Sequence, residues 1–228
     1  MLVDESAIQN EHMKFISESN ELGLHLIYTN NVLDFLDRYI RTEAHSSDAE
    51  LTYLRLIIRC FNDLAASLRL ALMGYWQPCF SQVRDLFETY SLLDLFNVEP
   101  ALTQVWLVLD EKKRWREFGP KKVRESLDKR DGHKLQKRDE AYGLLSKYAS
   151  HPTPEGFGIL AVNDLTQVGP FPSQKNLTAA FQELAKHSNE IARILWSSSL
   201  SRSEPRAELC NVCKSNSAIW FNGLKVIV

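Results

Sequence analysis

One apolar pattern in the first third of the chain limits the folds that it can adopt. Apolar side chains recur at steps of three and four residues, namely Leu54, Ile57, Ile58, Phe61, Leu64, Ala65, Leu68 and Leu72. This spacing is that of one face of an α-helix. Ser46, Ser47 and Asp48, which are favoured N-cap residues, precede the pattern, and Gly74 follows it. The sequence therefore predicts a long amphipathic helix that ends before Gly74.

The same apolar period continues through most of the chain, and interruptions of the period separate the predicted helices from one another. Further helices are predicted over 5–42 (as one or two), about 77–97, from Pro100 onward, around Tyr142, about 175–200 and about 204–221. Gly119-Pro120 and Asp131-Gly132 mark breaks between them. Apolar residues surround more than one side of 77–97, so we expect that helix to be central. The pattern predicts an all-α bundle of about seven or eight helices.

The length of the chain suits one large domain. With 228 residues, we expect a single all-α domain over 1–228. Within it we distinguish N-terminal helices over 1–46, a core bundle over 47–200 and a C-terminal helix over 201–228.

One segment departs from the helical pattern. Residues 152–173 are rich in proline and glycine, and 158–162 suits a short strand. Asn163 and Asp164 are placed to turn the chain back through 165–168, which predicts a small β-hairpin or extended insertion near 156–170. Such insertions often carry binding groups on a rigid scaffold. A dimer contact or a lid is an equal alternative.

Charge and composition exclude several classes of protein. The net charge of −2 excludes a strong basic field over the whole chain. Residues 110–140 nevertheless carry twelve basic and eight acidic groups, and such a stretch is either a solvated helix face or a surface for an anionic partner such as RNA. No apolar run reaches the length of a membrane span, and the first residues do not resemble a secretory signal. We therefore expect a cytoplasmic protein that does not insert into a membrane.

The cysteines and histidines predict neither a metal site nor a cofactor. Cys60 and Cys79 lie in apolar helical patterns and are expected to be buried. Cys210 and Cys213 form a C-x-x-C pair, but a zinc site needs two further ligands and a redox site needs a preceding strand. The simpler interpretation places both on a C-terminal helix, with Cys213 on its apolar face.

Five polar residues form the candidate site. Arg84 and Glu88 are four residues apart and can pair on one helix face. The pair is either a structural ion pair or a means of presenting Arg84 to a phosphate or carboxylate. Tyr142, Ser146 and His151 lie at the end of a later helix, where His151 is either a capping residue or a general acid–base with Tyr142 or Ser146 assisting.

These motifs resemble a group of bacterial helical families of unknown function related to HEPN-like domains. The resemblance covers about residues 50–200 and rests on Gly74, Tyr75, Arg84, Glu88, Tyr142, Leu145, Ser146 and His151. It implies an all-α, often dimeric protein, and many HEPN proteins are ribonucleases of toxin–antitoxin or phage-defence systems. In their signature four to six residues separate an arginine from the histidine that follows it, which corresponds to positions 144–146 before His151. Here residues 144–146 are Leu-Leu-Ser, and the nearest basic residue before His151 is Lys147.

The sequence therefore favours a cytoplasmic, homodimeric binding or regulatory module with a HEPN-like scaffold, in bacterial defence or a stress response. The first alternative is a metal-independent ribonuclease that uses His151 and Arg84. The second is a structural subunit of a complex.

Overall fold

The computed structural model describes residues 4–42, 45–133, 137–163, 165–199 and 203–227. Its helices are α1 Glu5–Ser17, α2 Asn20–Thr42, α3 Asp48–Leu72, α4 Trp76–Val98, α5 Ala101–Val108, α6 Glu111–Phe118, α7 Pro120–Arg130, α8 Lys137–Leu145, α9 Gln174–Ser197 and α10 Glu204–Ile227. Between α8 and α9 lie a π-helical turn η1 Ser146–Ser150, a 3-10 helix η2 Gly156–Leu160 and the strands β1 Ala161–Val162 and β2 Leu165–Thr166. The all-α bundle with a small β insertion is confirmed.

Capping residues and proline determine where several of the helices begin. Ser47 caps α3 by accepting a hydrogen bond from the Glu50 backbone N–H, and Ser173 caps α9 in the same way. The predicted break at Gly119-Pro120 separates α6 from α7, because proline suits the first turn of a helix. The described residues form ten α-helices where seven or eight were expected, because 100–130 is divided into α5, α6 and α7, while the division of 5–42 into two helices was one of the two alternatives expected.

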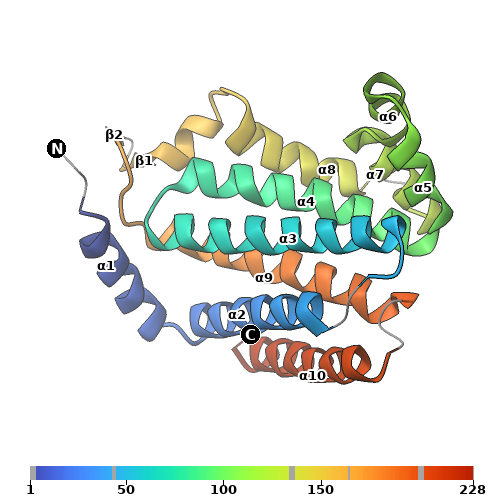
Figure 1. Ribbon diagram of the computed structural model, residues 1–228. Coiled ribbons are helices and arrows are strands. Elements are labelled where there is room, and N and C mark those ends of the chain that lie inside the picture. The colour runs from blue at the N-terminus through green and yellow to red at the C-terminus, as the bar shows by residue number, and fades with distance from the viewer. Residues whose placement is uncertain (1–3, 43–44, 134–136, 164, 200–202, 228) are drawn as a thin grey trace.

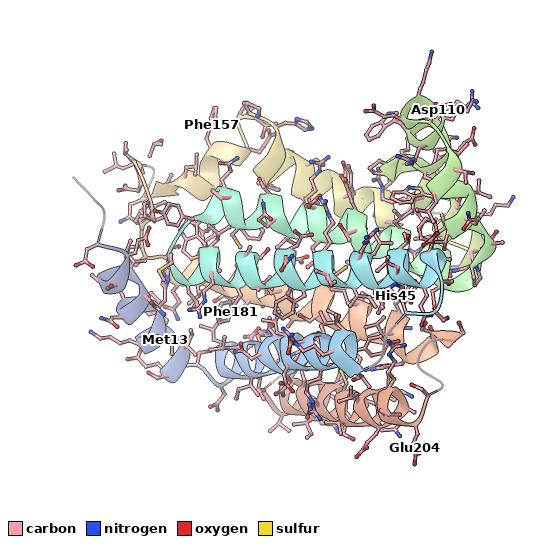
Figure 2. The ribbon with its side chains drawn as sticks, viewed as in Figure 1. Met13, His45, Asp110, Phe157, Phe181 and Glu204 are labelled. Atoms are coloured by element: carbon pink, nitrogen blue, oxygen red, sulfur yellow. The ribbon has the colours of Figure 1, made fainter. Side chains whose placement is uncertain are left out.

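The bundle is built around α4. Helix α4 packs against α3, α9, α7, α8 and η1, so the expected central position of this helix is confirmed. Figure 1 shows α3 and α4 side by side, with α9 behind them and α2 and α10 along the lower edge. Phe181 of α9 is 1% exposed and lies inside the bundle, whereas Phe157 of η2 is 56% exposed at its periphery (Figure 2).

The residues before α9 contact both the turn between α3 and α4 and helix α1. Gly74 has a φ of +80°, and a Cβ atom there would lie 2.5 Å from the Phe171 carbonyl oxygen. The Trp76 indole donates a hydrogen bond of 3.1 Å to the same oxygen. His12 of α1 contacts both the Leu72 carbonyl oxygen and the Ser173 backbone N–H. The α3–α4 turn, α1 and α9 therefore meet at one junction.

The insertion is smaller than the predicted hairpin. Residues 158–160 belong to η2 and are not part of a strand, while β1 and β2 pair antiparallel with Ala161 opposite Thr166 and Val162 opposite Leu165. The Thr153 hydroxyl accepts a hydrogen bond from the Gly156 N–H, and Asn176 donates one to the Ile159 carbonyl oxygen. These bonds hold the segment in a helical turn. Of the predicted turn, Asn163 has a positive φ of 49°, and Asp164 lies outside the described residues.

Candidate functional site

The structure brings three of the five predicted residues together. The Arg84 guanidinium lies 3.0 Å from Glu88 Oε1 on α4. Tyr142 of α8 donates a hydrogen bond of 2.7 Å to Glu88 Oε1 and accepts one from Arg84 Nη2. Both charged side chains are about three-quarters buried. The charges of Arg84 and Glu88 are paired within the group, which is typical of a clamp between two helices, although the buried Arg84 Nε has no hydrogen-bond partner within the described structure.

A second arginine, which the sequence did not single out, completes this cluster. Arg124 of α7 lies with its guanidinium carbon 3.7 Å from the centre of the Tyr142 ring, within cation–π distance. Its Nη2 atom is 2.8 Å from the Asp139 carboxylate. Arg84 also lies over the ring, at 4.8 Å. Tyr142 therefore joins α4, α7 and α8.

Ser146 and His151 do not join the cluster. The Ser146 hydroxyl is buried and has no hydrogen-bond partner within the described structure. His151 is exposed, and its backbone N–H caps η1 at the Ser146 carbonyl oxygen. The Ala149 carbonyl oxygen accepts hydrogen bonds from Gln77 and Ser81, in the first turns of α4. The structure thus shows no contact between His151 and the Arg84 cluster among the residues that it describes, and His151 follows a segment held against Gln77 and Ser81 of α4.

A pocket lies on the other side of α8, between α8 and α9. It has a volume of about 500 Å³. Its apolar lining includes Phe80, Ala141, Leu144, Leu145, Tyr148, Ile159 and Ala179, and its polar lining includes Glu155, Lys175, Asn176, Glu183, Lys186 and His187. Nearly all of these polar groups come from α9, and most of the apolar groups come from α8 and its continuation. The pocket therefore has one apolar and one polar wall.

His187 is the most buried polar residue of this pocket. Its side chain is 1% exposed, and its Nδ1 atom is hydrogen-bonded to the Tyr90 hydroxyl at 2.9 Å. Its Nε2 atom is 3.2 Å from Glu183 Oε2 but is not aligned for a hydrogen bond. Burial raises the pKa of Tyr90 well above its ordinary value. The tyrosine therefore stays neutral and fixes the orientation of the imidazole ring.

Glu183 is the ionised member of the same group. Burial raises its pKa, but its contacts with His187 and then the Lys186 ammonium group outweigh burial and lower the pKa to about 2. The carboxylate is thus charged at neutral pH. The pocket presents a fixed anion and an oriented imidazole at one end of its polar wall.

The spacing of Glu183 and His187 in the sequence is a local indication of their contact. Glu183 and His187 are four residues apart, on a helix whose neighbouring residues Leu184 and Ile191 are apolar and buried. An E-x-x-x-H pair on a buried face marks a histidine with a carboxylate partner. The Tyr90 contact had no such signal, because the two residues are distant in the sequence.

The cysteines occupy the predicted apolar positions. Cys60, Cys79, Cys210 and Cys213 are all buried. Burial raises the pKa of Cys79 and of Cys213 to about 12, so both are thiols at neutral pH. In the part of the chain that the structure describes, no three histidine, cysteine or acidic side chains form a group able to hold a metal ion.

None of the helices within the described ranges combines the length and the apolar character that a membrane crossing requires. Comparison of the chain with protein-family models, with curated proteins and with solved structures gives no match.

Proposed function

We propose that the protein is a binding module whose pocket between α8 and α9 holds a small amphipathic molecule. The observation that carries this proposal is the division of the pocket into an apolar and a polar wall. Its volume of about 500 Å³ falls within the range of small-molecule sites, which are mostly apolar with a few placed polar groups.

The insertion between α8 and α9 supports a binding role. Gly158 and Ile159 of η2 line the pocket, and Asn176 connects η2 to α9. The insertion between α8 and α9 thus forms one edge of the pocket through η2, and connecting segments commonly carry binding sites. This arrangement favours a binding or regulatory module with a HEPN-like scaffold over a purely structural subunit.

The geometry of the Arg84 cluster favours binding over ribonuclease activity. A metal-independent ribonuclease needs His151 and Arg84 in one cleft. Arg84 is engaged by Glu88 and Tyr142, and His151 is exposed beyond the start of α4. We also propose a cytoplasmic homodimer, for which light scattering on the purified protein should give twice the mass of the chain.

A neutral fluorescent probe tests the binding function. N-phenyl-1-naphthylamine fluoresces in apolar surroundings, and we expect saturable binding to the native protein. Ala179→Trp places an indole on the α9 wall and Ala141→Trp places one on the α8 wall, so each should weaken binding about tenfold or more by filling the space.

The matched control is Arg193→Trp, which adds the same indole to an exposed position of α9 outside this pocket. It should bind the probe as the native protein does. Absence of saturable binding, or equal binding by all three folded variants and the native protein, would contradict the proposed function.

A further inference from the structure

We propose that this pocket selects amphipathic molecules that carry one anionic group, and that Lys175 binds that group. The inference rests on the proposed binding function and adds the chemical class of the ligand.

The charges around the pocket leave one cation unmatched. Glu155 Oε1 lies 3.0 Å from Lys147 Nζ, and the Glu183 carboxylate lies 3.3 Å from Lys186 Nζ. Both carboxylates of the lining are thus neutralised. Lys175 has no acidic partner among the residues that the structure describes, and its side chain is exposed at the pocket. A ligand with one negative charge complements this arrangement.

The positions of the two lysines define the direction of the ligand. Lys175 lies in the first turn of α9, and Lys186 lies on the same wall about 16 Å further along the helix at 1.5 Å per residue. Ala179 lies between them and faces Leu144 and Leu145 across the pocket lining. An elongated molecule therefore fits with its charged end at Lys175 and its apolar body between α8 and α9.

His187 and Glu183 form the polar end of the pocket that lies away from Lys175. The His187 side chain is almost fully buried, its Nδ1 atom is hydrogen-bonded to the Tyr90 hydroxyl, and its Nε2 atom lies 3.2 Å from the Glu183 carboxylate. This end is therefore internally paired, whereas the end at Lys175 is not among the residues that the structure describes. The pocket thus holds polar groups at both ends of an apolar middle.

Isothermal titration calorimetry tests the inference with two probes of equal chain length, one of which is charged and the other uncharged. Decanoate carries a carboxylate, whereas decan-1-ol has the same chain without the charge. We expect decanoate to bind the native protein about fivefold to tenfold more tightly, the range of one charged hydrogen bond at a partly exposed site. Lys175→Met should remove this preference, and Lys175→Glu should reverse it.

Lys112→Met removes one exposed ammonium group on α6 and serves as the control, with the preference of the native protein retained. Equal binding of the two probes by the native protein, or an unchanged preference in Lys175→Met, would overturn the inference while leaving the proposed function in place. Failure of decanoate to bind at all would also overturn it. Failure of N-phenyl-1-naphthylamine to bind would instead count against the proposed function itself.

Discussion

The hydroxyl group of Tyr142 donates a hydrogen bond of 2.7 Å to the carboxylate of Glu88, and through it α8 is fastened to α4. Arg84 reaches the same hydroxyl and the same carboxylate. Helix α8 also forms the apolar wall of the pocket. The polar cluster therefore holds that wall in position, although none of Arg84, Glu88 and Tyr142 lines the pocket. The Arg84–Glu88 pair is therefore a structural feature in our account.

Removal of the Tyr142 hydroxyl should weaken the attachment of α8. Tyr142→Phe keeps the ring between Arg84 and Arg124 but leaves Glu88 with one hydrogen bond fewer. We expect a loss of about 1 kcal/mol in the free energy of unfolding, as for one partly buried hydrogen bond. Urea denaturation measures it. Tyr148→Phe, which alters an exposed hydroxyl, is the control, and equal stability of the two variants would argue against the clamp.

Two glycine-to-alanine substitutions should change the free energy of unfolding in opposite directions. Gly74→Ala introduces a Cβ atom that would lie 2.5 Å from the Phe171 carbonyl oxygen, at a positive φ, so we expect a loss of about 2 kcal/mol or more. Gly23→Ala lies within α2 with open space around it and should gain about 0.5–1 kcal/mol from helix propensity. Thermal unfolding of both variants checks this. A stable Gly74→Ala would show that the junction at Phe171 is not close-packed.

The contribution of His12 to the stability of the protein should fall as the pH drops below about 6.5, the ordinary pKa of histidine. Burial lowers the pKa of His12, whose Nε2 atom accepts a hydrogen bond from the Ser173 N–H while Nδ1 donates to the Leu72 carbonyl oxygen. The unfolded chain therefore binds the proton first, so protonation of this residue favours unfolding. We expect His12 to contribute a decrease of the thermal midpoint between pH 7 and 5.5, against the opposite contribution of Asp63, whose pKa is raised.

In His12→Gln that decrease should be reduced, although burial also lowers the pKa of His25 and leaves a residual slope. The exposed His151 provides the control, because His151→Asn should show the slope of the native protein. If His12→Gln shows that slope as well, His12 is not responsible for it.

Replacement of a buried carboxyl group should stabilise the protein. Burial and then the negative charge of Asp85 raise the pKa of Asp63 to about 6, and its Oδ2 atom has no hydrogen-bond partner within the described structure. The unfolded carboxyl group loses its proton near 3.8, so stability falls as the pH rises from there through 6. Asp63→Asn should gain about 1–3 kcal/mol at pH 7 and much less at pH 4. Denaturation at the two pH values measures the difference, and an equal effect at both would contradict the raised pKa.

The sequence predicted the features that depend on local order along the chain. The period from Leu54 to Leu72 and the cap at Ser47 fixed α3, because both are properties of a single helix. Arg84 and Glu88 were correctly placed on one face for the same reason. Their grouping with Tyr142 was an expectation that the resemblance to HEPN-like families implied, and the structure shows the three side chains in contact.

The features that the sequence did not predict depend on contacts between distant segments. His151 was expected to join Arg84, but it is exposed after the π-helical turn η1, which the hydrogen bonds of the Ala149 carbonyl oxygen hold against Gln77 and Ser81. The pocket is lined by residues of α4, α8, η1, η2 and α9, and no local pattern in the sequence shows that these segments border one space. The Tyr90–His187 contact likewise requires α4 and α9 to be packed first.

The central claim is that the space between α8 and α9 binds an amphipathic molecule, and methyl NMR during a titration with N-phenyl-1-naphthylamine tests it most directly. Ile159 lines the pocket, whereas Ile57 is fully buried in the core of α3. We predict that the Ile159 methyl resonances shift in a saturable manner and that those of Ile57 do not. Unchanged Ile159 resonances, at probe concentrations that saturate the fluorescence, would contradict the account.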